Sequence, residues 1–160
     1  MSISLLRIDD RLIHGQVVMT WIRHIQCTQI KIVDQKTADD VFMCKLLLSI
    51  APRGIELEIM GVEKAVAAFQ EWESSSEHVM VIVRTPMTLQ EMAAGGIKFK
   101  AINIGGIAIS ADRKKFHKNI ALTTEEHAFL LSQVKNGVDV YYQMIVSERR
   151  VPITEKMFSH

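Results

Sequence analysis

Short apolar runs rich in isoleucine and valine alternate along the chain with longer segments in which apolar positions recur at helical spacing. Several of these runs are apolar on both faces, as in strands that helices cover on both sides of a parallel sheet. The pattern predicts seven strands, at residues 3–8, 30–33, 55–60, 79–84, 101–104, 119–122 and 138–144. It predicts helices at residues 15–25, 37–52, 62–73, 85–96 and 123–137.

Helix start signals support these elements. Thr37 and Thr85 are predicted N-caps, and Pro86 suits the first helical position because its missing N–H would have no partner there. Thr123 and Glu126 have the spacing of a capping box. The alternation of strands and helices predicts an α/β fold. We expect a single doubly wound, mainly parallel sheet of about seven strands, with helices on both faces.

Composition narrows the possible partners. The chain has 160 residues, 48% hydrophobic and 23% charged, which suits one domain at residues 1–160 with one core. Its formal net charge is +1, and the sequence has no basic stripe. These features argue against a nucleic-acid partner.

The N-terminal sequence, the short apolar runs and the cysteines predict a cytoplasmic protein. The start MSISLLRIDD reaches charged residues too early for a signal peptide, and no apolar run approaches the roughly 20 residues that cross a bilayer. Cys27 and Cys44 have no paired metal-ligand spacing, so both are predicted to be buried or half-buried free thiols. Free thiols are typical of a reducing compartment.

The stretch RIDDRLIHGQVVMTWI, at residues 7–22, crowds two carboxylates and two arginines near one histidine. Residues 9–15 are predicted to connect the first strand to the first helix, at the carboxyl end of the strand, where open α/β sheets bind ligands. A helix that begins near Gly15 would present unpaired N–H groups and a positive dipole end beside His14. This environment favours an anion, and a phosphoryl group in particular.

The side chains of this loop suit phosphoryl transfer through histidine. Arg11 offers a planar fork that can hold phosphate oxygens in pairs. Asp10 can orient one imidazole nitrogen of His14, which leaves the other unprotonated and nucleophilic. Charge and spacing alone leave a second interpretation open, in which His14 only caps a helix and the charges beside it form an ion-pair cluster that fixes a turn.

A family resemblance decides between these interpretations. RIDDRLIHGQV resembles the active-site signature of the IIB components of the mannose/fructose/sorbose family of the bacterial phosphoenolpyruvate-dependent sugar phosphotransferase system. IKIVDQKTADDVFMCKLLLSIAP is similar to the family's second strand and following helix. VMVIVRTP is similar to a strand that ends in a basic residue and Thr-Pro, and INIGG to the Gly-rich end of a later strand. The chain is therefore identified as a member of this family.

The resemblance implies a protein-Npi-phosphohistidine–sugar phosphotransferase that needs no metal or other cofactor. His14 would accept a phosphoryl group on Nδ1 from a IIA partner and pass it to a sugar that membrane IIC and IID components import. Arg11 would contact the phosphoryl group and Asp10 would support the loop, while Gly15 and Gln16 belong to the same signature. The chain would act in the cytoplasm, peripheral to the membrane through these partners.

Two places depart from the family pattern. Gln35 stands where members often have a second acid after Asp34. Residues 112–115, Asp-Arg-Lys-Lys, stand where members often have a Gly-Lys-Lys turn. The loop at residues 111–119 is therefore expected to dock differently. The basic residues at 113–118 either are simply solvated or steer an acidic partner.

Further candidates follow two later strands. Arg84 and Thr85 end the fourth predicted strand, on the same rim as His14 if the sheet is parallel. They are predicted to bind phosphate or support the loop, with helix capping as the alternative for Thr85. Gly105 and Gly106 follow the fifth strand, where they either let the backbone approach a ligand or form a turn.

Two other function classes fit less well. A receiver domain, which is phosphorylated on aspartate, needs an acid after a later strand and a lysine after another. Met60-Gly61 and Gly105-Gly106 stand at the corresponding strand ends. A hydrolase that used His14 as a general base would need a serine or cysteine nucleophile, and none lies beside it in the sequence.

The partner-docking surface is expected around residues 9–16, with Arg84 and residues 111–118 at its margins.

Overall fold

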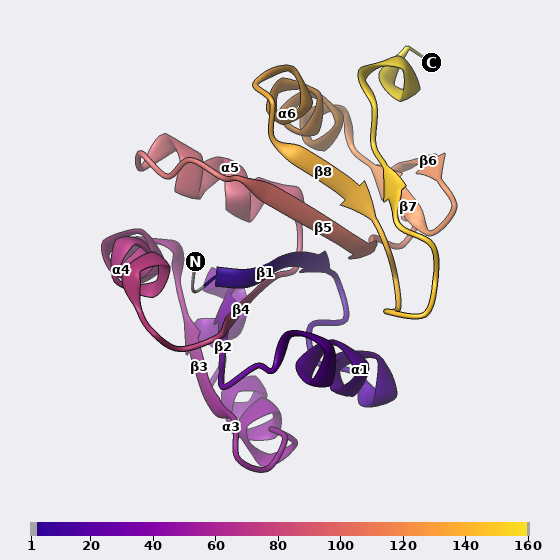
Figure 1. Ribbon diagram of the computed structural model, residues 1–160. Helices are drawn as coiled ribbons and strands as arrows, with labels where there is room; N and C mark the ends of the chain where they lie inside the picture. Colours follow the sequence, from indigo (N-terminus) through magenta and orange to yellow (C-terminus); the bar gives the residue numbers. More distant parts are fainter. Residues whose placement is uncertain (1–2, 160) are drawn as a thin grey trace.

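The computed structural model describes residues 3–159, in which helices cover both faces of a twisted central sheet (Figure 1). The two ends of the predicted 1–160 domain, Met1-Ser2 and His160, lie outside the described residues. The strands are β1 (Ile3–Asp9), β2 (Gln29–Val33), β3 (Glu56–Met60), β4 (Val79–Val83), β5 (Ala101–Gly106), β6 (Lys114–His117), β7 (Ile120–Leu122), β8 (Asp139–Tyr142) and β9 (Val151–Pro152).

The main sheet has seven strands in the order β3-β2-β4-β1-β5-β8-β9. Its pairs are parallel except that of β8 with β9, which is antiparallel. The helices are α1 (Gly15–Ile25), α2 (Gln35–Ala38), α3 (Val41–Ser49), α4 (Val62–Ser74), α5 (Pro86–Ala94), α6 (Thr124–Lys135) and the 3-10 helix η1 (Glu155–Phe158). The predicted α/β class and mainly parallel sheet are confirmed.

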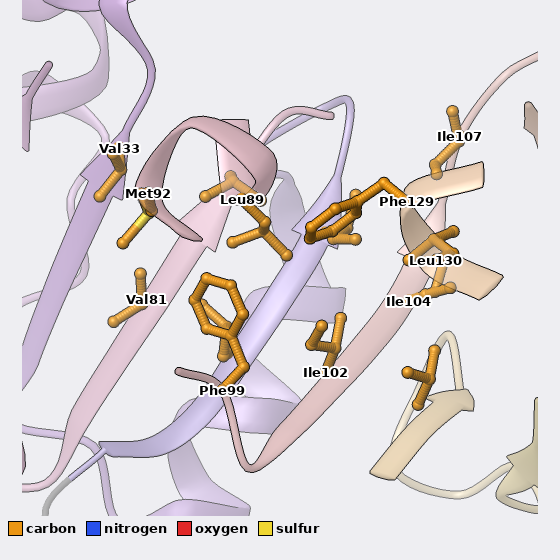
Figure 2. Close-up of a cluster of buried hydrophobic side chains, with 14 of the residues drawn as sticks. Val33, Val81, Leu89, Met92, Phe99, Ile102, Ile104, Ile107, Phe129 and Leu130 are labelled. Carbon is orange, nitrogen blue, oxygen red and sulfur yellow. The ribbon is translucent and has the colours of Figure 1, made fainter. Parts of the chain in front are cut away.

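Two hydrophobic clusters, one on each face of the sheet, explain why the strands are apolar on both sides. α1 and α3 pack on one face, where Trp21, Ile22 and Leu47 meet strand residues such as Ile30. α4, α5 and α6 pack on the other. Figure 2 shows that second cluster, with Val81, Ile102 and Ile104 from the sheet, Leu89 and Met92 from α5, and Phe129 and Leu130 from α6.

The predicted helix at residues 37–52 is wrong as a single element, because the chain forms α2 and then α3. Thr37 lies inside α2, and the N-cap is Asp34, whose carboxylate accepts the Thr37 N–H at 3.1 Å. Asp40 caps α3 in the same way by accepting the Met43 N–H at 3.1 Å. Aspartate is a strong N-cap, and the extended backbone of Asp40 (φ −102°, ψ 100°) interrupts the helical path. The N-cap at Thr85 and the capping box of Thr123 with Glu126 are confirmed.

The predicted strand at residues 119–122 exists as β7, but it does not join the main sheet. It pairs antiparallel with β6, a strand within the predicted loop at residues 111–119. The seventh strand of the main sheet is instead the short β9. Periodicity shows that a run is extended, whereas the sheet that the run joins depends on partners distant in sequence.

The two predicted thiols are also where expected. Cys27 is buried and Cys44 half-buried, and both are free. Burial raises the pKa of the Cys27 thiol to about 11, and its Sγ donates to the Gln29 carbonyl oxygen at 3.2 Å. Cys27 is therefore a packing residue that is protonated at neutral pH.

The carboxyl ends of β1 and β4 lie side by side in the sheet. These neighbouring strands lead into α1 and α5, which cover opposite faces of the sheet. Such a switch point is the usual ligand site of an open α/β sheet because the two connections diverge there.

Candidate functional site

The loop of residues 10–14, between β1 and α1, is held by two buried side chains. Leu12 is 3% exposed and Ile13 is 7% exposed, both in the cluster under α1. Leu12 has a left-handed backbone with φ 57°, a conformation that costs a non-glycine residue roughly 1–2 kcal/mol. Its burial and its N–H bond to the Asp9 carbonyl oxygen (3.0 Å) hold the turn in place.

Asp9, fully buried at the end of β1, is the central acceptor of the site. Its Oδ2 accepts from Nε2 of His14 at 2.9 Å and from Nη2 of Arg7 at 3.0 Å. Its Oδ1 accepts from the main-chain N–H and the Nε–H of Arg11, at 3.1 and 3.2 Å. Burial by itself raises the pKa of Asp9, but the His14 hydrogen bond and the Arg7 charge outweigh it, so the pKa lies below its ordinary value. Asp9 is therefore a buried carboxylate anion.

His14 is the N-cap of α1, and its side chain is 21% exposed. Because Asp9 is ionised and only accepts, Nε2 carries the hydrogen of their shared bond. A neutral ring then has its lone pair on Nδ1. The prediction that Asp10 orients the imidazole is wrong, since Asp9 holds that position. Asp9 is the last residue of β1, and it lies two residues from Arg7 on the α1 side of the sheet.

Asp10 instead fastens the loop to β4 and β5. Its Oδ2 accepts the Ala108 N–H at 2.7 Å, and its own N–H donates to the Gly106 carbonyl oxygen at 3.1 Å. Its carbonyl oxygen accepts from Nη1 of Arg84 at 2.9 Å. These contacts agree with the loop-supporting role that was one of its two expected roles.

Arg11 combines a fixed end with an exposed one. Its Nε is bonded to Asp9, yet 46% of its side chain is exposed. The guanidinium lies at a cleft of about 650 Å³, lined by Asp10, Arg11, Gly106, Ile107, Ala108, Ile109, Lys115, Lys118, Asn119, Ile120, Ala121 and Met144. The exposed part of the fork is therefore available to an incoming anion beside His14.

Gly15 and Gln16 are both exposed and begin α1 directly after His14. Gly15 has φ +48°, a left-handed conformation that glycine adopts without strain. The first-turn N–H groups of α1 have no partners within the helix, so this end favours a negative charge beside the histidine.

Arg84 and Thr85 lie on the predicted rim, but both make contacts within the protein. Arg84, which directly follows β4, donates through Nη1 to the Asp10 carbonyl oxygen. Its Nη2 donates to the Thr37 hydroxyl at 3.2 Å, and its Nε donates to Oδ2 of Asp34 at 3.4 Å. Thr85 accepts the Met87 N–H at 3.2 Å as the cap of α5. The structure thus supports loop bracing for Arg84 and the capping alternative for Thr85.

The structure places Gly105, Gly106 and the basic residues at 113–118 in defined surroundings. Gly105 and Gly106 belong to β5 rather than to a turn. Arg113 makes a two-pronged contact with the buried Glu126, at 3.0 Å for each bond, so this arginine is not simply solvated. Lys115 and Lys118 line the cleft beside Arg11.

Sequence reasoning gave no role to Arg7, although its guanidinium makes four hydrogen bonds at the site. It is 3% exposed and contacts Asp9, Asn103 and the carbonyl oxygens of Gln143 and Met144. A charged residue within an otherwise apolar strand was the available signal, since such a residue is rarely buried without a partner.

Other classes of site find little support among the described residues. Residues 3–159 contain no group of three or more His, Cys, Asp or Glu side chains that could hold a metal ion. In the same part of the chain, no helix has the length and apolarity of a membrane span. Within these residues, His24 and His78 lie exposed at the surface, while Trp21 and Trp72 are buried in the core.

Comparison with known proteins agrees with this geometry. The sorbose-specific EIIB component of Klebsiella pneumoniae is 31% identical over 157 residues, which cover 98% of this chain and 96% of the relative. The crystal structure of the IIBSor domain of the sorbose permease from that organism has a TM-score of 0.88 at 30% identity, covering 98% of this chain and 96% of that one. The N-acetylgalactosamine-specific IIB component 1 of Escherichia coli has a TM-score of 0.84 at 27% identity, covering 94% and 99%.

A sequence model described as "PTS system sorbose subfamily IIB component" matches residues 3–160. The match includes the His14 loop, the strands β1 and β4 and the β6–β7 hairpin. The signature around His14, the doubly wound sheet and these relatives agree with one another. The chain belongs to the sorbose-subfamily IIB components of the mannose/fructose/sorbose family of the sugar phosphotransferase system.

Proposed function

We propose that His14 is the phosphoacceptor of this chain and that the phosphoryl group is carried on Nδ1. The observation that carries the proposal is the 2.9 Å bond from Nε2 to the buried Asp9 carboxylate, which leaves Nδ1 as the nucleophilic atom. Arg11 and the first turn of α1 supply the positive charge that a phosphoryl group requires.

IIB components of this family work with IIA proteins and membrane IIC and IID components. In the proposed reaction, the Nδ1 lone pair attacks phosphorus, the bond between phosphorus and the IIA donor breaks, and a phosphoramidate forms on His14. A sugar hydroxyl held by the IIC and IID components later attacks the same phosphorus. The hydroxyl loses its proton, the P–N bond breaks, and His14 regains its lone pair.

Roles for the other site residues follow from their contacts. Arg11 stabilises the charge on the phosphoryl oxygens during transfer. Asp9 fixes the ring, whereas Asp10 and Arg84 brace the loop through the Asp10 carbonyl oxygen. Gly15 and Gln16 keep the α1 end open. We propose that residues 1–160 act as one IIB domain at the cytoplasmic side of the membrane.

The direct test is to mix the purified chain with phosphoenolpyruvate, the general phosphotransferase proteins and a cognate IIA, and then to map the phosphorylated residue. We expect one phosphate, on His14, that is lost in mild acid and survives base. An acyl phosphate on Asp9 or Asp10 would instead be base-labile. Phosphate on another residue, or a His14→Ala chain that still accepts it, would refute the proposal.

A further inference from the structure

We infer that Arg7 is a positioning residue for phosphoryl transfer, which acts on His14 through Asp9, and that Gly105 is the residue that makes room for it. The inference rests on the proposed function of His14. Arg7 donates through Nη2 to the same Asp9 oxygen, Oδ2, that accepts from Nε2 of His14. One buried oxygen therefore joins the guanidinium to the imidazole.

The guanidinium is held in a single orientation by its contacts. Nη1 donates to Oδ1 of Asn103 at 2.6 Å and to the Gln143 carbonyl oxygen at 3.0 Å. Nη2 donates to Asp9 at 3.0 Å and to the Met144 carbonyl oxygen at 2.9 Å. A planar fork can reach four acceptors in these directions, whereas a lysine ammonium has only three donors at one point.

Trp21 fixes the same group from the side of α1. The guanidinium carbon lies 5.4 Å from the centre of the Trp21 ring, and the indole N–H donates to the Met144 carbonyl oxygen at 3.0 Å. Met144 also lines the cleft beside Arg11. Arg7 thus links the connection between β8 and β9 to Asp9, the residue directly before the loop of residues 10–14.

Gly105 provides the space that this arrangement needs. In the pairing of β1 with β5, Ile8 lies opposite Ile104 but Asp9 lies opposite Gly106, so Gly105 is the extra residue of a bulge. A Cβ atom at Gly105 would lie 2.2 Å from the guanidinium carbon of Arg7. At Gly106 the nearest atom would be 3.5 Å away, which is ordinary contact distance. The two neighbouring glycines therefore differ in a way that an alanine scan can measure.

A purely structural role explains the burial of Arg7 less well. Burying an ion pair is expensive, and well-packed apolar residues often serve stability equally well or better. What an apolar residue at position 7 could not do is keep Asp9 ionised. A neutral Asp9 would no longer be an obligatory acceptor, and the proton of the His14 ring would not be confined to Nε2.

The experiment measures the imidazole tautomer of His14 by 15N NMR in the unphosphorylated protein. We expect the Nε2–H form in the wild type and in the control Gly106→Ala. Gly105→Ala, which removes no polar group but displaces the Arg7 guanidinium, and Arg7→Gln should both show a mixture with the Nδ1–H form. Arg7→Lys, which keeps the charge, should restore part of the Nε2–H population.

The same variants are then phosphorylated by phosphoramidate, a small donor that needs no protein partner. We expect Gly105→Ala and Arg7→Gln to react about 10- to 100-fold more slowly, as when the groups that orient metal-ligating histidines are removed. Wild-type tautomer and rate in both variants would overturn the inference. Loss of the fold in both would overturn it as well, since Arg7 would then serve only stability. A wild type that shows the tautomer pattern but accepts no phosphate would refute the proposed function alone.

Discussion

Arg11 and His14 are held by the two oxygens of one carboxylate. Oδ1 of Asp9 accepts from Nε of Arg11 at 3.2 Å, and Oδ2 accepts from Nε2 of His14 at 2.9 Å. Because Asp9 is fully buried, the arginine fork and the imidazole keep a fixed relation although both reach the surface. A phosphoryl group on Nδ1 would therefore meet a cation whose position is already set.

This relation predicts a geometric requirement at Arg11. Arg11→Lys keeps the charge but loses the fork and its bond to Asp9, so transfer from the donor to His14 should slow roughly 10- to 1000-fold, or about 1.4–4 kcal/mol in barrier. Single-turnover transfer measures the effect, and urea unfolding should show an intact fold because the side chain is half exposed. Equal transfer rates in wild type, Arg11→Lys and Arg11→Ala would leave Arg11 with a structural role alone.

The lowered pKa of Asp9 predicts how the free energy of unfolding depends on pH. Its folded pKa lies below its ordinary value of 3.8, so its contribution is complete above that pH and is lost as the pH falls through the folded pKa. Asp9→Asn should lower the free energy of unfolding by about 3–5 kcal/mol at pH 7, because Arg7 becomes a buried charge without its counterion. The difference from wild type should narrow at pH 3.

Urea unfolding at pH 7 and pH 3 tests this expectation. Asp139→Asn is the matched control, because Asp139 pairs with Arg150 at the surface and its loss should cost less than about 1 kcal/mol. An Asp9→Asn effect that is as small as the control, or that grows in acid, would contradict the assignment of a buried carboxylate anion.

Cys27 should resist alkylation in the folded protein. With a pKa of about 11, only about one thiol in a thousand is ionised at pH 8, and the side chain is buried as well. A Cys44→Ser variant isolates the signal of Cys27. We expect negligible iodoacetamide labelling at pH 8 and complete labelling in urea. Rapid labelling of the folded variant would show that Cys27 is accessible and that its burial is not maintained in solution.

The isolated chain should carry phosphate without transferring it to sugar. The reactive loop opens onto a cleft with apolar walls and exposed lysines, and no aromatic side chain lines it within the described residues. Sugar sites commonly use aromatic platforms, and under the proposed function both the donor and the acceptor protein would have to reach His14 in turn.

The test is to phosphorylate the chain, remove the donor and add mannose, fructose, sorbose or an amino sugar. The phosphate should stay on His14, apart from slow hydrolysis, until membranes with the IIC and IID partners are supplied. Rapid formation of sugar phosphate without those membranes would identify a self-contained sugar kinase instead.

Features set by neighbours in the sequence were predicted well. The boundaries of α1, the cap at Thr85 and the capping box at Thr123 all depend on residues within four positions of one another, so the local pattern contains the information. The cluster of charges before Gly15 likewise marked the loop that the structure places at the carboxyl end of β1, where Asp10 and Arg11 line the cleft.

Features set by distant segments were decided only by the tertiary structure. The sequence alone made Asp10 the partner of His14, but the position of Asp9 depends on Arg7, which in turn depends on Asn103 and on carbonyl oxygens at residues 143–144. The same holds for β7, which pairs with β6 outside the main sheet. The partners of Arg7 lie up to 137 positions away along the chain, and short-range periodicity carries no record of them. The sequence by itself thus determined the class of fold and the position of the charged loop around His14, whereas the folded chain decided which carboxylate contacts the histidine, because only the packed sheet buries Asp9 and Arg7 together against partners such as Asn103.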